Sequence, residues 1–295
     1  MDWRLIACVV FLYKYGFVHV ATKKIGAVEG SRTRKLVWQY FFAACIAVVV
    51  AAITGQLELS WPVVIVMVVG AGNAFGCYCQ WRAYDISMSR TAMLSNFDDL
   101  VAIGLGYAFL GELQLLTPIL TAGIVVSVVS VMVFAIAGRR DKLKDGKSVY
   151  QLIGWVLGYT LVWGISYFSM RFFSLQGISI PTYVAAFYVG SLLGALFTRF
   201  VIMGKKEEGE PLKPRQLAKV LLLAVGILTA LMLSYWMRAF VPITVIQPIQ
   251  LVAGMSIPAL IGMIFFKEIH NMSRQEIVTI GFGLVGVAII AISAI

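Results

Sequence analysis

The chain has 295 residues, of which 60% are hydrophobic and only 13% are charged, and its net charge is +10. A soluble domain carries about 25% charged residues, whereas the apolar residues here gather in runs of roughly 20, the length that crosses about 30 Å of hydrocarbon. These features exclude an ordinary soluble enzyme and predict an all-α polytopic membrane protein.

Ten apolar runs separated by polar residues predict ten transmembrane helices in chain order. Several connections are only a few residues long, so neighbouring helices are expected to be antiparallel. The predicted spans cover roughly residues 3–22, 35–54, 62–82, 91–110, 117–137, 151–171, 181–203, 217–238, 243–266 and 275–294.

A segment at the end of the third span returns 156 residues later in the chain. With this offset Arg82 falls on Arg238 and Glu112 falls on Glu268, and no gap is needed between them. Self-similarity at a fixed offset is the signature of an internal repeat.

The repeat divides the chain into two five-helix units, residues 1–140 and 148–295. Because each unit has an odd number of spans, the two units enter the membrane from opposite sides. Such inverted repeats are related by an axis in the membrane plane, and in transporters the substrate site lies between them near the midplane. We therefore expect the two repeats to surround a central cavity.

The distribution of positive charge predicts an orientation. All 24 lysines and arginines except Arg4, Lys14, Arg171 and Arg238 lie in or beside the loops that follow odd-numbered spans. The positive-inside rule places those loops in the cytoplasm and both termini outside. The expected location is the cell membrane, such as a bacterial or archaeal inner membrane.

Three ionisable residues fall inside predicted spans, where charge is costly and often functional. They are Lys14 in the first span and Asp98 and Asp99 in the fourth. One interpretation is that a carboxylate exchanges a proton or pairs with a substrate ammonium; the alternative is a structural ion pair with Lys14. Adjacent helical residues point about 100° apart, so at most one aspartate should face the cavity centre.

Four uncharged side chains complete the predicted substrate-binding set. Gln247 and Gln250 offer amides beside Pro248, which interrupts the backbone hydrogen bonds of the ninth span. Tyr78 and Trp163 could line a cavity or hold a cation against a ring. The alternatives are contacts between neighbouring helices for the glutamines and plain packing for the aromatic rings.

The residues shared by the two repeats predict a different task. Arg82 and Arg238, and likewise Glu112 and Glu268, occupy equivalent span ends on opposite faces. This symmetry favours capping or gating salt bridges at the two mouths over contact with a substrate. Small-residue pairs predict close helix packing within the chain; they are Gly72 with Gly76, Gly154 with Gly158, and Gly190 with Gly194.

Motifs near the span ends resemble those of the drug/metabolite transporter (DMT) superfamily, in particular its ten-span EamA-type branch. The matching features are Gly111-Glu112 and its second copy Lys267-Glu268, and Trp163-Gly164 with Arg171 seven residues later. The resemblance implies ten helices around a central cavity and alternating access for small organic solutes. Family members usually keep their termini in the cytoplasm, whereas the charge count places them outside.

The favoured function is secondary active transport of a small polar metabolite, an amino acid or similar, with protons as a candidate coupling ion. One alternative is a carrier of organic cations, drugs or quaternary amines, and another is a lipid-handling or structural membrane protein without transport. No nucleotide-binding loop, catalytic triad or metal-ligand pattern stands out, so we expect neither an enzyme nor a cofactor. The expected partners are the solute and membrane lipids but no nucleic acid, and the protein is expected to be monomeric, with a dimer left open.

Overall fold

The computed structural model describes residues 3–26, 31–95, 97–111, 149–203 and 211–268, with scattered positions between 117 and 129 and between 274 and 285. The described residues form helices and no strand. In chain order the elements are α1 (Trp3–Phe11), the π-helix η1 (Leu12–Val18), α2 (His19–Gly26), α3 (Arg32–Ile53), α4 (Trp61–Ile86), α5 (Met88–Leu94), α6 (Phe97–Phe109), α8 (Val149–Leu175), α9 (Ile180–Phe197), the π-helix η5 (Thr198–Met203), α10 (Pro214–Phe240) and α11 (Ile243–Ile264).

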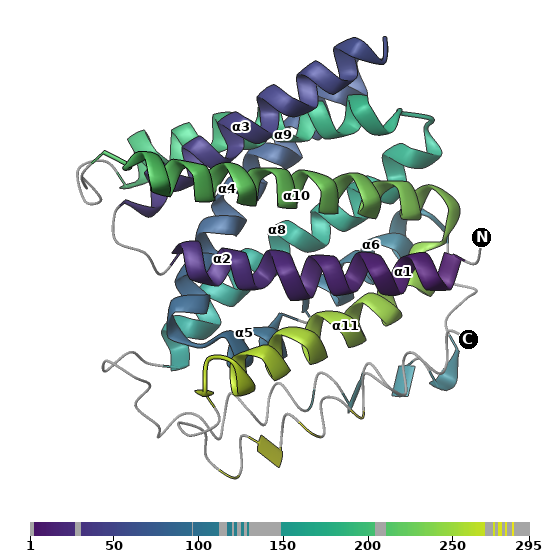
Figure 1. Cartoon of the computed structure of the whole chain (residues 1–295). Coiled ribbons are helices and arrows are strands. Elements are labelled where there is room, and N and C mark those ends of the chain that lie inside the picture. Colours follow the sequence, from purple (N-terminus) through teal and green to yellow (C-terminus); the bar gives the residue numbers. More distant parts are fainter. Residues whose placement is uncertain are drawn as a thin grey trace.

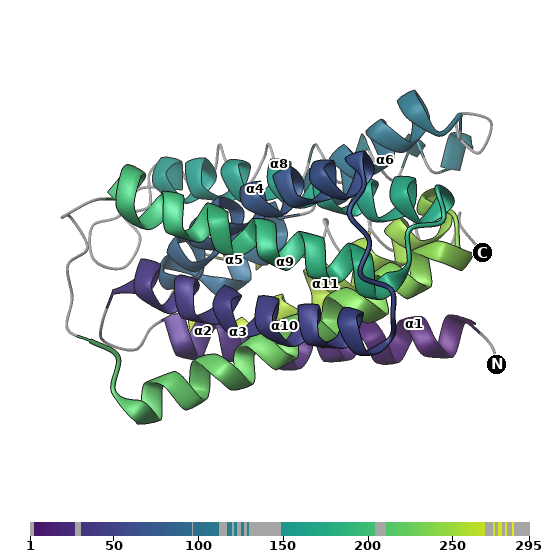
Figure 2. The ribbon, with the colours of Figure 1, turned by 90° about the horizontal axis from the view of Figure 1, so that it is seen from above.

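The described helices confirm the all-α class, and their length and apolar composition are consistent with a membrane protein. Five of them, within residues 32–53, 61–86, 150–175, 180–202 and 214–240, are long and apolar enough to cross a bilayer. Figures 1 and 2 show the long helices running side by side in one general direction, as in a bundle. Predicted spans 117–137 and 275–294 fall largely outside the described residues, so the ten-span count and the inverted repeat stay predictions.

Local sequence signals explain where two of the long helices begin. The Ser31 hydroxyl accepts a hydrogen bond from the Arg34 backbone N–H at 3.2 Å and so caps α3. Ser179 does the same for Thr182 at 3.3 Å, with proline in the first turn of α9. Serine at such a position satisfies a backbone donor that the helix itself leaves free, and proline in the first turn lacks one.

Helices α4 and α9 pack with their backbones in contact, because glycines lie at the crossing. A Cβ added to Gly190 would lie 1.9 Å from the Met67 carbonyl oxygen, and one added to Gly194 would lie 2.1 Å from that of Ala71. The predicted close packing at this pair is therefore confirmed. At Gly72 an added Cβ would meet nothing within 4 Å, so the prediction of close packing is wrong there.

This crossing predicts a strong effect of a single methyl group. Gly190→Ala is expected to destabilise the protein by about 3 kcal/mol or more, the upper end of the usual cost of overpacking, because backbone rather than a flexible side chain must move. The measurement is the melting temperature of the purified protein. Gly72→Ala is the matched control and should leave that temperature unchanged; an equal drop in both variants would refute the packing argument.

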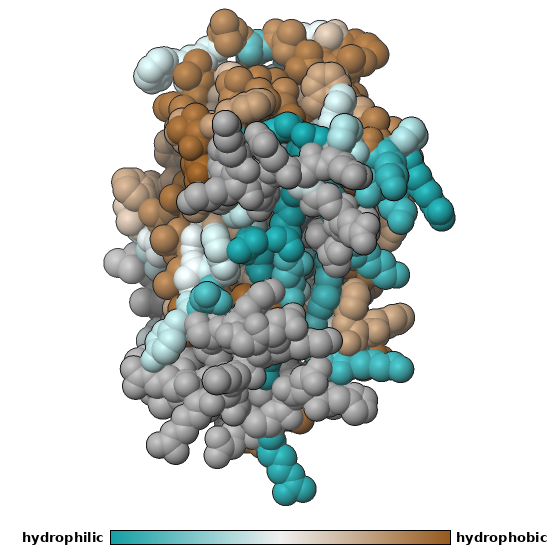
Figure 3. Space-filling view, turned by 90° about the vertical axis from the view of Figure 1, so that its left-hand side faces the viewer, coloured by the Kyte–Doolittle hydropathy of each residue, from teal (hydrophilic) through white to brown (hydrophobic). Residues whose placement is uncertain are grey.

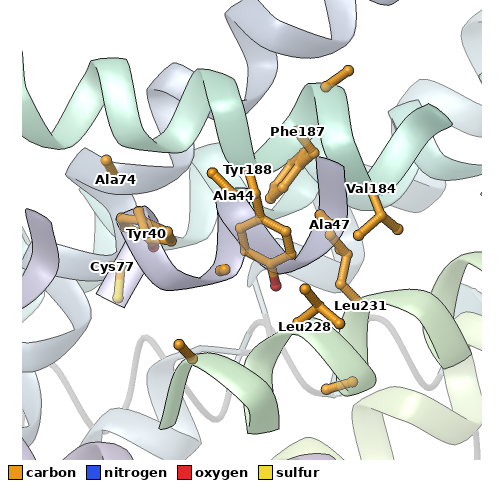
Figure 4. Packing of buried hydrophobic residues seen from close by; sticks show 14 of the residues in the cluster. Tyr40, Ala44, Ala47, Ala74, Cys77, Val184, Phe187, Tyr188, Leu228 and Leu231 are labelled. Atoms are coloured by element: carbon orange, nitrogen blue, oxygen red, sulfur yellow. The ribbon is translucent and has the colours of Figure 1, made fainter. Parts of the chain in front are cut away.

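The core beside this crossing joins α3, α4, α9 and α10 (Figure 4). Alanines on α3, including Ala44 and Ala47, leave space for the rings of Phe187 and Tyr188 on α9. Leu228 of α10 closes the cluster from the other side. Small residues facing large rings let these helices pack around the central region that holds the buried polar groups.

The fourth predicted span, 91–110, is wrong as a single helix. The chain forms two helices, α5 and α6, and α6 begins at Phe97. Asp98 and Asp99 therefore occupy the first turn of a buried helix rather than lying two turns inside one. Gly164 of α8 allows α6 to approach here, since an added Cβ would lie 2.8 Å from the Asp98 carbonyl oxygen.

Several basic residues gather at one end of the bundle. Lys23 of α2, Arg32 at the start of α3, Arg82 near the end of α4 and Arg215 at the start of α10 all lie at one end, which we call the basic end. Figure 3 faces this end and shows hydrophilic side chains gathered across it, with apolar residues along one flank. This separation matches the expected asymmetry of loop charge.

Candidate solute-binding site

Lys14 is buried in the π-helical segment of the first helix. The backbone N–H of His19 bonds to the Lys14 carbonyl five residues earlier, the spacing that defines a π turn. The Lys14 side chain is only 7% exposed, and its ammonium donates a hydrogen bond of 2.8 Å to the Tyr167 hydroxyl. It also lies 4.4 Å from the centre of the Tyr167 ring and 5.8 Å from that of Trp163. Aromatic faces attract cations, so they partly replace the lost water.

A second buried cation, Arg238, joins α10 to α11. Its guanidinium donates to the side-chain oxygens of Gln247 at 3.1 Å and Gln250 at 2.6 Å. The nitrogens of the same two amides donate to Asp99 Oδ1 at 2.6 and 2.9 Å. Each glutamine thus bridges the arginine and the carboxylate: its oxygen accepts from Arg238 and its nitrogen donates to Asp99. Both partners together fix the orientation of each amide.

The Tyr167 ring connects this network to Lys14. The Arg238 guanidinium carbon lies 4.8 Å from the ring centre, close to the distance of the Lys14 ammonium. Two basic side chains thus share one aromatic ring, and their formal charges and those of the two aspartates at the start of α6 sum to zero. The positive end of the α6 dipole also favours carboxylates in its first turn.

A cavity of about 60 Å³ lies beside this charged centre. Lys14 and Trp163 line it, together with Gln39 of α3, Asn73 of α4 and Ser234 of α10. Gln39 Oε1, Asn73 Oδ1 and Ser234 Oγ are buried without a hydrogen-bond partner among the described residues, as is the Trp163 ring N–H. Buried polar atoms are nearly always paired, so these groups are available to hydrogen-bond water or a polar ligand in the cavity.

The cavity offers two complementary kinds of polar group. The Lys14 ammonium and the Trp163 N–H are donors that suit a carboxylate. The side-chain oxygens of Gln39 and Asn73 are acceptors that suit an ammonium, amine or hydroxyl. At about 60 Å³ the space holds on the order of four water molecules, so a larger solute requires the surrounding helices to separate.

The structure separates the predicted substrate-binding residues into three groups. Lys14 and Trp163 line the cavity, whereas Asp98, Asp99, Gln247 and Gln250 are buried and do not belong to its described lining. Tyr78 also turns away and packs edge-on against Trp155, with ring centres 6.0 Å apart. Neither aspartate belongs to this lining, so a role of Asp98 or Asp99 in substrate binding stays a prediction. A direct ion pair between Lys14 and an aspartate does not occur in the described part of the chain.

The residues shared by the repeats do not occupy matching places. Arg238 is fully buried and binds the glutamines, so its expected position at a mouth is wrong: its side chain turns inward from the last turn of α10. Arg82 is partly exposed and lies 5.3 Å from the Trp155 ring centre. Glu112 lies outside the described residues.

Glu268 forms a latch at the basic end between the two halves of the chain. Its carboxylate pairs with Lys23 and accepts hydrogen bonds from the Ser87 hydroxyl at 2.8 Å and from the backbone N–H groups of Met88 at 3.0 Å and Ser89 at 2.9 Å. Burial alone would raise the pKa of Glu268, but Lys23 and the hydrogen bonds outweigh burial and lower this pKa to about 2. The latch caps α5 and holds α2, α5 and α11 together.

The latch predicts a pH-dependent difference between wild type and Glu268→Gln. The lowered pKa, about 2 instead of 4.5, corresponds to about 3 kcal/mol at about 1.4 kcal/mol per unit. This contribution is fully present above pH 4.5 and is lost as pH falls through about 2. The melting-temperature difference should thus be constant from pH 5 to 8 and shrink toward zero in acid. Glu58→Gln, at an exposed position, is the control; no difference at pH 7 would contradict the latch.

Sequence reasoning missed two cavity residues with open acceptors, Gln39 and Asn73, as substrate-binding candidates. Gln39 lies one turn after Lys35 in α3, and Asn73 lies in the apolar middle of α4. Because an amide inside a span is costly unless paired, the position of Asn73 was an available signal. Tyr167, which bonds to Lys14, gave no comparable signal, since aromatic residues are common throughout α8.

Comparison with known proteins supports the fold alone. No family model matches the chain, and no curated protein matches it. A solved structure described as "Crystal structure of protein" is similar with a TM-score of 0.62 and 16% sequence identity, covering 99% of this chain and 97% of that one. At this identity the likeness extends to the arrangement of helices and carries no function.

Proposed function

We propose that the protein is a secondary active transporter that moves a small polar metabolite, an amino acid or similar solute, by alternating access. The observation that carries this proposal is the buried polar cavity beside a charge-balanced centre inside a membrane bundle. Unpaired acceptors on Gln39 and Asn73 and a cation at Lys14 are costly in an apolar core unless a solute uses them.

Contacts between the two halves of the chain at both ends of the bundle support a closed state, from which each end would open separately. The Lys23–Glu268 latch joins the halves at the basic end. At the opposite end the Thr182 hydroxyl donates to the Gln56 carbonyl, again between the halves. Breaking one tie while keeping the other would open the cavity to one side at a time. The DMT-like motifs and the expected inverted repeat are compatible with such a cycle.

The carrier of organic cations is the second candidate, and the cavity supports it less well. A cation site is favoured by a carboxylate, whereas the described lining of the cavity contains the cation Lys14 and no Asp or Glu. Asp99 is occupied by two amides, and the Tyr167 ring already faces Lys14 and Arg238. A lipid-handling protein without transport would not require a cavity with buried polar walls.

A ligand screen on the purified protein separates these candidates. A ligand that binds only the folded state raises the melting temperature. Three solute classes should be compared: compounds with an acidic and an amino group, compounds with only an acid, and quaternary amines. We expect the first class to give the largest rise. A rise with quaternary amines alone would favour the cation carrier, and no rise with any class would remove support for a solute site.

A further inference from the structure

A second hollow lies at the basic end between α4 and α8, apart from the central cavity. It has a volume of about 440 Å³. Arg32, Arg82 and Asp85 line its charged part, Gln151 adds one amide, and the rest of the lining is mostly apolar and includes Trp155, Gly154 and Phe75. We call it the α4–α8 groove.

The charged part of the groove contains guanidinium N–H groups that make no hydrogen bond to a described residue. Arg32 pairs with Asp85, so the two arginines and one aspartate leave a net charge of +1. Within the described part of the chain Arg82 forms no hydrogen bond or ion pair, and its guanidinium only lies over the Trp155 ring. A planar guanidinium with unused N–H groups suits a phosphate, which it can bind through two parallel hydrogen bonds.

The other part of the groove is apolar and open. An added Cβ at Gly154 would meet nothing within 4 Å, so the Gly154–Gly158 pair, predicted to pack a helix, leaves space at its first member. Phe75 is 37% exposed. Along α4 the step from Arg82 to Phe75 is seven residues, about 10 Å toward the middle of the bilayer. The groove is therefore charged at the membrane edge and apolar below it.

We propose that the α4–α8 groove binds one anionic phospholipid, with the phosphate on Arg82 and an acyl chain over Gly154. Charge complementarity selects the anionic headgroup, and the change from charged to apolar walls matches an amphiphile lying along the membrane normal. Anionic lipids favour basic sites at the cytoplasmic surface, the side on which the positive-inside rule places this end. The proposal is independent of the transported solute.

The test uses full-length protein purified in detergent, depleted of lipid and then supplied with micelles of phosphatidylglycerol or phosphatidylcholine. Native mass spectrometry counts the retained lipid. Wild type should retain one phosphatidylglycerol about tenfold more tightly than phosphatidylcholine, because the choline ammonium of the latter cancels the phosphate charge that the net +1 of the groove attracts. Gly154→Leu fills the apolar part where space is open and should weaken retention of both lipids. Arg82→Gln removes the positive charge and should abolish the preference for phosphatidylglycerol. Arg215→Gln removes an exposed arginine at the same end and should retain it.

Three results would overturn the proposal. Equal retention of both lipids by wild type would show that the arginines select nothing. If inorganic phosphate alone stabilised the protein against heat as strongly as phosphatidylglycerol does, the groove would be assigned to a free anion. A wild-type dimer that becomes a monomer in Gly154→Leu would show that a second copy of the chain occupies the groove.

Discussion

Replacing Lys14 with methionine is expected to weaken binding of a carboxylate-bearing solute on the order of 100-fold, since losing one partner of a buried hydrogen-bonded charge pair costs about 2–5 kcal/mol. The ammonium is the only cation lining the described part of the cavity. Methionine has a similar length and no charge, so the helix should still pack. Binding is measured with radiolabelled solute on purified protein.

The stability of the same variant distinguishes a binding role from a structural one. Lys14 donates a hydrogen bond to Tyr167 but forms no ion pair among the described residues, and its replacement also removes the desolvation cost of a buried ammonium. Lys14→Met should therefore melt close to the wild-type temperature. Lys24→Met, which removes an exposed lysine of α2, should bind solute normally. A normal affinity in Lys14→Met would exclude Lys14 from the site, whereas a much lower melting temperature with a lost affinity would assign Lys14 a structural role.

The second large effect is expected in the network that connects Arg238 to Asp99. Arg238→Met leaves a buried carboxylate without its cation, and Asp99→Asn leaves a buried cation without its carboxylate. Each change should cost about 3–5 kcal/mol of unfolding free energy, as for other broken buried pairs. The double variant should lose less than the sum of the two, with a coupling of about 1–3 kcal/mol.

A denaturant titration in mixed micelles measures this cycle. The control pairs Asp99→Asn with Arg82→Met, because Arg82 is the predicted repeat equivalent of Arg238 but lies in the α4–α8 groove. These two changes should be additive. If the Arg238 and Asp99 changes were also additive, the two glutamines would not transmit a charge interaction between them.

Sequence patterns predicted the membrane class and the residues of the charged centre because burying charge is costly. Lys14, Asp99, Gln247 and Gln250 stood out as polar groups within apolar runs, and the structure brings them around Tyr167 and Arg238. The sequence therefore shows which polar residues lie within a span. It does not show as well which face of a helix points to the interior, because polar residues in this bundle lie on several faces.

Two incorrect predictions, the position of the aspartates and the direction of Arg238, arose because helix ends and side-chain directions are not specified by the spacing of residues along the sequence. Asp98 and Asp99 were expected inside one helix. Instead α5 ends at Leu94 and α6 begins at Phe97, so the aspartates lie in the first turn of a helix. Arg238 sits near the end of α10, yet a long side chain can turn inward to reach glutamines on α11. Side-chain direction at a helix end depends on the neighbouring helix, which sequence spacing does not specify.

The repeat predicted symmetry, but the differences between its copies identify the site better. Arg82 and Arg238 correspond in sequence, whereas one lies in a groove at the basic end and the other in the buried network. Equivalent residues in two copies can therefore serve different tasks. The ten-span count, the orientation of the termini and the family resemblance stay predictions.

Solute counterflow in proteoliposomes tests the proposed transport most directly, because it requires alternating access but no known coupling ion. Vesicles loaded with millimolar unlabelled amino acid are diluted into a trace of the same labelled amino acid, and the assay is repeated with organic acids, sugars and quaternary amines. We predict transient accumulation of a solute that carries an acidic and an amino group in wild type and in Lys24→Met, and none in Lys14→Met. Absence of counterflow with every solute class in wild type, or equal counterflow in Lys14→Met, would contradict the proposed site and its function.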